Sequence, residues 1–258
     1  MIRKHFTAKY KEDNANILTA GVMHPNGYSI ALAFLDRIRF YHLLLDDIKC
    51  FYELPSKRVK TLRYSHGGQF LCYSYGKGKG TFISVISTIN MQEICQLKVG
   101  SDVEQIIWSE NDYELICACQ GYISKWSLVD SFANREDIEV SETINLMRFD
   151  FKTNKLLVST KNSILEIENS TNFRRVPVPI PNFHFAYPLD GKYIFGDAEG
   201  YLHVAQTLEC EKAERLAVGT SRSFLYSKSG TLIHLTPETS EVFIIRTKAG
   251  VETKTVKE

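Results

Sequence analysis

Paired carboxylates are the first candidate for catalysis, because two of them can act as acid and base on one bond. The most obvious pair in this chain is Asp46-Asp47. Adjacent residues of a strand point to opposite faces of a sheet, so these two side chains cannot serve one acid–base site. We therefore expect Asp46 and Asp47 to form a polar strand end or a loop.

A glycine-rich basic run at 76–80, GKGKG, could suggest phosphate binding. It lacks the G-x-x-x-x-G-K-[ST] spacing that lets backbone amides surround a phosphate. Because it lies between YSY (73–75) and TFISVIS (81–87), we expect the tip of a hairpin. Such a tip is either a plain solvated loop or, through Lys77 and Lys79, a contact for an acidic surface of a partner.

The seven histidines form no H-x-x-x-H or H-x-H pair, and no acidic residue stands beside them at metal-ligand spacing. The chain has no G-x-S-x-G elbow and no local cysteine nucleophile signature. Catalytic triads are recognised by geometry, so a triad built from distant residues stays open at this point. We predict a protein that is not an enzyme and that binds no metal or cofactor.

The six cysteines form no CxxC pair. Cys117 and Cys119 are two residues apart, on one face of the apolar segment YELICAC (113–119). We expect all six cysteines to be reduced thiols packed in sheets, in a reducing compartment.

These candidates lie on a repeat that positions them. A bulky apolar residue, nearly always aromatic, sits four residues before a turn position, and an apolar run follows the turn. The bulky residues are Met23, Tyr64, Trp108, Phe149, Tyr187 and Tyr226. The turns are HPNG (24–27), SHGG (65–68), SEND (109–112), DFKT (150–153), PLDG (188–191) and SKSG (227–230). A period near ~40 residues is typical of a WD-repeat β-propeller.

The sequence therefore predicts an all-β fold, a WD40-type β-propeller with six to seven four-stranded blades. We expect one domain over residues 1–258. The expected blades span roughly 16–56, 57–99, 100–142, 143–181, 182–218 and 219–258. The segments KHFTAKY (4–10) and VETKTV (251–256) both alternate, so residues 1–15 could supply a ring-closing strand and we expect the termini to meet.

The third blade shows the pattern best. In YISKWSL (122–128), Tyr122, Ser124 and Trp126 alternate and point to one face. Trp126 stands where a WD repeat places its tryptophan, but no aspartate follows it. Residues 129–139 are expected to form a loop with a short outer strand, and PVPIP (177–181) a sheet edge, a crossover or a polyproline ligand.

Composition narrows the class of partner. The chain has 31 Lys and Arg against 30 Asp and Glu, a formal net charge of +1. The net charge therefore predicts no overall electrostatic attraction to nucleic acid or to an anionic membrane. No apolar run approaches the ~18 residues of a membrane span, and the N-terminus lacks the apolar region of a signal peptide. The aromatic residues recur at the repeat period, which indicates blade cores rather than base stacking.

Three segments resemble the second propeller of the WD-repeat family of cilia- and flagella-associated protein 57. They are HPNGYSIALAFLDRIRFYHLLLDDIKCFYEL (24–54), YSHGGQFLCYS (64–74) and VEQIIWSENDYELICACQGYISKWSL (103–128). The segment LLLDDIKCF (43–51) carries the resemblance most specifically, and NSILEIENSTNFRRVPV (162–178) continues it in order. The chain departs from the family by showing neither an upstream propeller nor sustained a/d heptads.

The resemblance implies a non-enzymatic scaffold of the motile-cilium axoneme, in the cytoplasm and cytoskeleton. Such a scaffold helps dock inner dynein arms on doublet microtubules beside the dynein regulatory complex. Its partners would be subunits of these assemblies, coiled-coil proteins and tubulin, within a large complex and without nucleic acid. It implies no catalytic residues.

Two rival functions stay open at this point. One is a general propeller adaptor outside cilia, in a ubiquitin ligase or an RNA-processing complex. The other is an enzyme or small-ligand binder that uses the central channel. For a scaffold, we expect partner contacts in charged loops between the core strands. These loops would hold Lys77, Lys79, Arg135, Glu136, Arg174 and Arg175.

Overall fold

The computed structural model describes residues 17–253, without 45–46, 57, 78–79, 151, 170–171, 190, 200, 217–222, 227–230, 237–240 and 247–249. For residues 223–253 it describes the strands but not the side chains. The expected ring-closing segment at 4–10 lies outside the described residues, as do residues 254–256 of the segment 251–256. The expected ring closure, with the two termini meeting, therefore stays a prediction.

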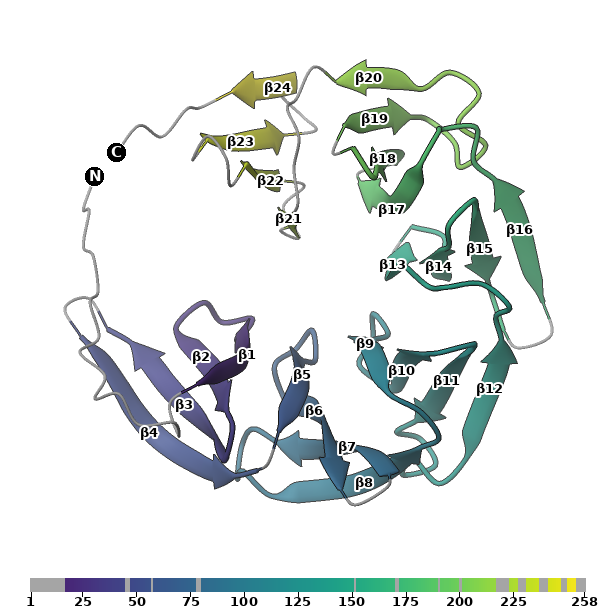
Figure 1. Ribbon diagram of the computed structural model, residues 1–258. Helices are drawn as coiled ribbons and strands as arrows, with labels where there is room; N and C mark the ends of the chain where they lie inside the picture. Colours follow the sequence, from purple (N-terminus) through teal and green to yellow (C-terminus); the bar gives the residue numbers. More distant parts are fainter. Residues whose placement is uncertain are drawn as a thin grey trace. The chain divides into compact units, whose positions relative to one another are not determined.

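Every regular element in the described residues is a strand, and the strands form six four-stranded antiparallel sheets. Each sheet contains four consecutive strands, hydrogen-bonded in chain order, as Figure 1 shows. By its contacts the chain divides into two compact units, residues 1–139 and 140–258. The prediction of an all-β chain is confirmed.

Unit 1 contains three of these sheets. The first is β1 (Leu18–Met23), β2 (Ser29–Phe34), β3 (Arg37–Leu43) and β4 (Ile48–Pro55). The second is β5 (Val59–Tyr64), β6 (Phe70–Lys77), β7 (Gly80–Ser87) and β8 (Glu93–Val99). The third is β9 (Val103–Trp108), β10 (Glu114–Cys119), β11 (Tyr122–Ser127) and β12 (Arg135–Glu139).

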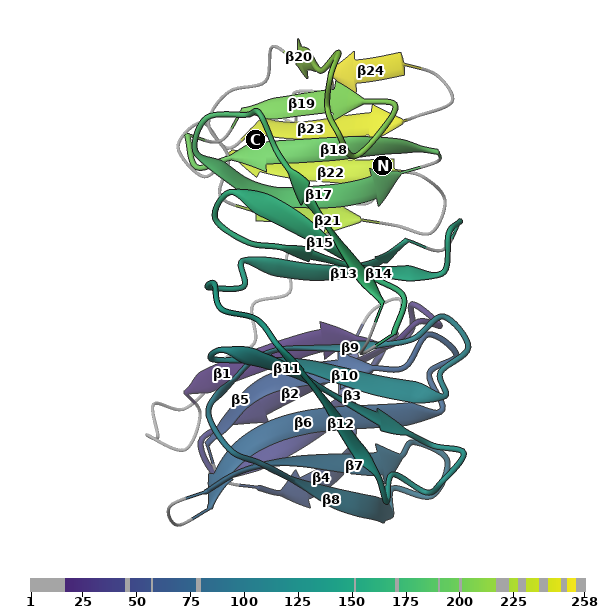
Figure 2. The ribbon, with the colours of Figure 1, turned by 90° about the vertical axis from the view of Figure 1, so that its right-hand side faces the viewer.

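Unit 2 contains the other three. The fourth sheet is β13 (Leu146–Asp150), β14 (Lys155–Ser159), β15 (Ser163–Ile167) and β16 (Phe173–Pro177). The fifth is β17 (Phe183–Leu189), β18 (Lys192–Asp197), β19 (Leu202–Ala205) and β20 (Glu214–Leu216), whose strands lie side by side in Figure 2. The sixth is β21 (Ser223–Tyr226), β22 (Thr231–Thr236), β23 (Glu241–Arg246) and β24 (Gly250–Thr253).

The repeated bulky residue marks the end of the first strand of each sheet. Met23, Tyr64, Trp108 and Tyr226 are the last residues of β1, β5, β9 and β21. Phe149 and Tyr187 lie close to the ends of β13 and β17. The outer strands also agree with the sequence: β12 follows a turn after residue 128, and β16 is an edge strand that ends at Pro177, where a missing N–H breaks no ladder.

The turn after the first strand repeats with the same backbone geometry in all three sheets of unit 1. The residue after the bulky one donates its N–H across the turn: His24 to Ser29, Ser65 to Phe70 and Ser109 to Glu114. The fourth turn position has a positive φ each time, 76° at Gly27, 76° at Gly68 and 61° at Asp112. That conformation favours glycine, and Asp and Asn tolerate it.

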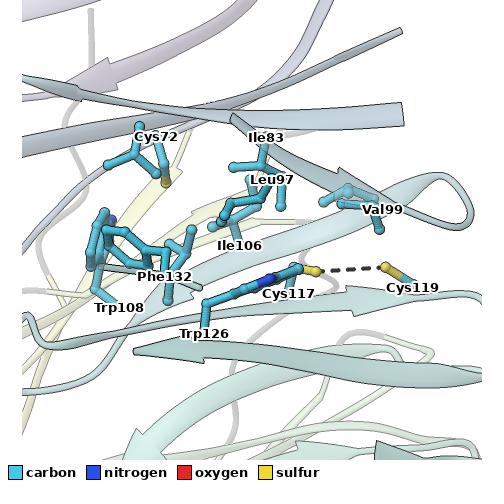
Figure 3. Close-up of a cluster of buried hydrophobic side chains, with 13 residues drawn as sticks. Cys72, Ile83, Leu97, Val99, Ile106, Trp108, Cys117, Cys119, Trp126 and Phe132 are labelled. Carbon is cyan, nitrogen blue, oxygen red and sulfur yellow. Dashed lines mark hydrogen bonds between the residues drawn. The ribbon is translucent and has the colours of Figure 1, made fainter. Parts of the chain in front are cut away.

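Neighbouring sheets bury their faces against one another. One cluster joins the second and third sheets and includes Leu97, Ile106, Trp108, Trp126 and Phe132, which Figure 3 shows together. A second cluster joins the first and second sheets around Phe40 and Leu71. In unit 2, Leu157 and Ile164 of the fourth sheet pack with Phe183 and Phe195 of the fifth.

Cys117 and Cys119 lie in the first of these clusters, with their Sγ atoms 3.6 Å apart (Figure 3). This confirms that the two thiols share one face of β10. The hydrogen bond between the thiols lowers the pKa of Cys119 and raises that of Cys117. All six cysteines are free, but Cys50 on β4 is exposed, so the expectation that every thiol packs inside a sheet is wrong for it. An outermost strand has no neighbour on one side to cover such a residue.

Gly68 is the turn glycine that a side chain would disturb most. A Cβ there would lie 2.4 Å from His24 Cε1, whereas nothing lies within 4 Å of a Cβ on Gly27. We expect Gly68→Ala to lower the free energy of unfolding by about 2–3 kcal/mol, from the positive φ and a displaced histidine. Gly27→Ala, with the same φ, should lose only about 1 kcal/mol.

Urea unfolding followed by tryptophan fluorescence measures both changes. Equal losses for the two variants would contradict the packing role of His24, and His24→Ala should narrow the gap between them.

The thiols should differ widely in reactivity. Burial raises the pKa of Cys72 to about 12, and it raises those of Cys95 and Cys210 to about 11 each. At pH 8 a thiol with a pKa of 11 is about one part in a thousand thiolate, the reactive form. The pKa of Cys119 is lowered, but this thiol is only 1% exposed. We therefore expect the native chain to take up one N-ethylmaleimide rapidly, at Cys50, whose side chain is exposed. Intact-mass spectrometry over time checks this, and Cys50→Ser should abolish the fast phase. Several equally fast additions would show that the sheets open readily.

Candidate interaction surfaces

The charged residues expected in loops lie mainly on strands. Arg135 and Glu136 belong to β12, and Arg174 and Arg175 belong to β16, so their placement in loops is wrong. Both strands are outermost in their sheets. Sequence charge alone does not separate a solvated loop from the edge strand of a sheet, because both are polar on the outside.

These side chains already have partners within the chain. Arg135 donates to Asp137 Oδ1 at 2.7 Å and lies over the rings of Tyr122 and Trp126, at 5.3 and 5.8 Å. That contact confirms that the two rings share a face of β11. Glu136 lies 3.9 Å from Lys125 Nζ.

On β16, Arg174 bridges Glu166 and Glu209 at 3.0 and 2.9 Å, and the hydrogen bond to Glu166 raises the pKa of Arg174. Arg175 pairs with Glu142. Arg174 and Arg175 remain about half exposed, so both can still be reached by a partner.

The lysine hairpin lies where the sequence places it. Lys77 ends β6 and pairs in register with Gly80 of β7, so the run 76–80 does join two strands. Lys79 lies outside the described residues. Asp47 stands in the turn between β3 and β4, where its Oδ1 accepts the Ile48 N–H at 2.8 Å, and Asp46 also lies outside the described residues.

The sequence did not predict that the three first-strand turns of unit 1 bind one another. His24 Nδ1 accepts the Asn26 N–H at 3.1 Å, which leaves the ring proton on Nε2. That nitrogen donates to the Gly68 carbonyl oxygen at 3.0 Å, so the first turn is joined to the second.

Asp112 joins the second turn to the third. Its two carboxylate oxygens accept the N–H groups of His66 and Gly67, each at 2.6 Å. His66 Nε2 in turn lies 3.2 Å from the Trp108 carbonyl oxygen. The recurrence of His at the turn (His24, His66) was the only signal in the sequence, and it did not reveal the partner.

Each sheet of unit 1 also joins its two turns at this end. The N–H groups of Leu43, Thr88 and Leu128, which follow or end the third strands, donate to the carbonyls of Tyr28, Gln69 and Tyr113. The six turns therefore form one hydrogen-bonded surface, which we call the turn face. It consists of residues 24–28, 44 and 47, 65–69, 88–92, 109–113 and 128–134. Such a surface presents side chains on a fixed frame, which suits binding better than catalysis.

Within the described residues, no group of three or more His, Cys, Asp or Glu side chains is placed to hold a metal ion. The same residues include no helix that could cross a membrane.

Comparison with solved structures shows the fold. The chain superposes on the Myceliophteria thermophila Cps50 (Swd1) beta-propeller domain with a TM-score of 0.69, at 11% identity, covering 93% of this chain and 87% of that one. It also matches Kluyveromyces lactis Hsv2 with a TM-score of 0.67, at 12% identity, covering 89% of this chain and 73% of that one. The fold is a WD40-type β-propeller, as the period predicts.

Comparison of sequences points to one group of proteins, although no protein-family model matches the chain. Mouse cilia- and flagella-associated protein 57 is 26% identical over 171 residues, which is 65% of this chain and 13% of the relative. Cilia- and flagella-associated protein 57 C of Tetrahymena thermophila is 28% identical over 127 residues, 45% of this chain and 10% of the relative. The resemblance predicted from the sequence is confirmed. The chain matches about a tenth of the length of these relatives.

The carboxylate of Asp112 should stabilise the propeller more than its neighbours do. Asp112→Asn keeps one acceptor oxygen and tolerates the positive φ, so we expect a loss of about 1 kcal/mol; Asp112→Ala should lose about 2–3 kcal/mol. Glu110→Gln, in the same turn, should change stability by less than about 0.5 kcal/mol. Urea midpoints of the three variants measure this. An Asp112→Ala variant as stable as Glu110→Gln would show that the turns do not need this link.

Proposed function

We propose that this chain is a non-enzymatic WD-repeat scaffold of the motile-cilium axoneme. In this role it helps to dock inner dynein arms and borders the dynein regulatory complex on doublet microtubules. The observation that carries the proposal is the similarity to cilia- and flagella-associated protein 57 of mouse, which extends over 65% of the chain. The propeller fold supports it, because a rigid set of turns can hold several partners at once.

The proposed partners are subunits of those two assemblies, coiled-coil proteins and tubulin, in the cytoskeleton of the cilium. In this proposal the whole chain acts as one domain. The balanced charge of +1 suits protein partners better than nucleic acid.

We propose that the outer strands β12 and β16 contribute contacts through Arg135, Glu136, Arg174 and Arg175, and the β6–β7 hairpin through Lys77 and Lys79. Edge strands offer unpaired backbone groups as well as charge to a partner. Among the ion-paired arginines that the structure describes, Arg174 is the most exposed, with 57% of its side chain accessible. Because the guanidinium of Arg174 is already paired with Glu166, it would add geometric specificity to a contact with a partner rather than an unpaired charge.

The test is a tagged chain expressed at native level in a cell with motile cilia. We expect it in the axoneme fraction after detergent removes the membrane and matrix, with crosslinks to dynein-arm and regulatory-complex subunits. Pull-downs from ciliated and deciliated cells should share few partners.

A destabilised variant separates folding from docking in this experiment. Gly68→Ala should lower the amount of tagged protein, whereas Gly27→Ala should lower it less, with the remaining protein still axonemal. Recovery of ubiquitin-ligase or RNA-processing subunits alone, from both kinds of cell, would overturn the ciliary proposal in favour of a general adaptor.

A further inference from the structure

The turn face of unit 1 carries exposed apolar side chains at equivalent positions of three consecutive sheets. An aliphatic residue follows each of the three residues whose N–H groups join the turns: Leu44 follows Leu43, Ile89 follows Thr88 and Val129 follows Leu128. These side chains are 51%, 85% and 83% exposed. Tyr28 and Tyr113, which accept two of the hydrogen bonds that join the turns, are 71% and 53% exposed.

This pattern is not ordinary surface scatter. Single exposed apolar residues are common on proteins, but Leu44, Ile89 and Val129 occupy equivalent positions in three sheets. Tyr28 and Tyr113 accept hydrogen bonds from the residues that precede two of them, and all five lie on a single hydrogen-bonded surface. A repeat needs only its sheet faces buried, so packing does not explain aliphatic side chains at turn tips. Leu44 also belongs to the segment LLLDDIKCF (43–51), which the repeat pattern of the propeller does not account for.

The charges on the turn face are all of one sign. Its described residues include Asp47, Glu110, Asp112 and Asp130 and no Lys or Arg. Asp112 is engaged by two backbone amides, but Asp47 and Glu110 are exposed. The balanced charge of the whole chain therefore hides a local acidic surface.

The other end of the same strands carries charges of both signs. In an antiparallel sheet, the connections between first and second and between third and fourth strands lie at one end, and the remaining connections lie at the other. Among the described residues, the latter hold Arg58 together with Asp36 and Asp102. Among the described residues of unit 1, charges of a single sign are therefore a property of the turn face and not of both ends.

We propose that the turn face binds a basic amphipathic peptide segment of a partner protein, with apolar side chains on Tyr28, Leu44, Ile89, Tyr113 and Val129 and Lys or Arg beside Asp47 and Glu110. Apolar contacts supply affinity, and the acidic rim selects the sign of charge. A second copy of this chain fits less well, because two acidic faces repel each other. The inference deepens the proposed scaffold role and rests on it, by naming the surface a scaffold would use.

The probe is a fluorescein-labelled 18-residue peptide of leucine and lysine patterned as an amphipathic helix, with a leucine–glutamate peptide of the same pattern as its control. Anisotropy is measured against the full-length chain at two salt concentrations. We expect the lysine peptide to bind at least tenfold more tightly than the glutamate peptide, and more weakly at high salt.

Matched variants locate the binding. Ile89→Ser should weaken binding about tenfold, whereas Ile94→Ser, at an exposed isoleucine on β8, should leave it unchanged. Glu110→Gln should weaken binding and flatten its salt dependence, whereas Glu139→Gln, at the other end of the strands, should not. Urea midpoints verify that all four variants are folded.

Equal effects of Ile89→Ser and Ile94→Ser, or equal binding of the two peptides, would overturn the proposal. Self-association of the chain in sedimentation that Ile89→Ser abolishes would replace it with a dimer face. The assay uses purified protein, so its result is independent of localisation. Peptide binding without axonemal localisation would contradict the ciliary function and support the binding surface. Axonemal localisation without peptide binding would support the ciliary function and contradict the binding surface.

Discussion

The structure depends on the burial of sheet faces against neighbouring sheets. A four-stranded sheet of this size cannot stand alone in water, because both faces of its inner strands are apolar. On β10 five of six residues are buried, and on β15 all five are, whereas on β12 one residue of five is buried. This difference between the middle strands and the fourth strand requires each sheet to have neighbours and leaves the fourth strands as the polar boundary.

That constraint explains what could be predicted from the sequence. A bulky residue at the end of the first strand, a turn and an apolar second strand recur because every sheet must solve the same packing problem. Met23, Tyr64 and Trp108 accordingly end β1, β5 and β9. The burial of Trp126 follows from the alternation of β11, even though the aspartate of the WD pair is absent and Arg135 covers the ring instead.

The links between turns could not be predicted, because they join residues about one repeat apart. His24 and Gly68 are 44 residues apart, and His66 and Asp112 are 46 apart. Each residue has an adequate local explanation as a turn former, so nothing in the local sequence indicates a bond to the next turn. The placement of the charged residues of β12 and β16 in loops was wrong for a related reason. An edge strand and a loop have the same polar composition, and only the order of strands in the sheet distinguishes them.

Rigidity and exposure are connected at the turn face. A loop that carries aliphatic side chains in water gains by folding back on itself, unless its backbone is held in place. Here the backbone groups of the turns are engaged by His24, by Asp112 and by the amides of Leu43, Thr88 and Leu128, so Leu44, Ile89 and Val129 stay exposed on a fixed frame. A partner that binds them therefore does not have to order the loops, and this saves part of the entropy that association usually costs. The same hydrogen bonds that stabilise the propeller thus make its turns a suitable surface for docking.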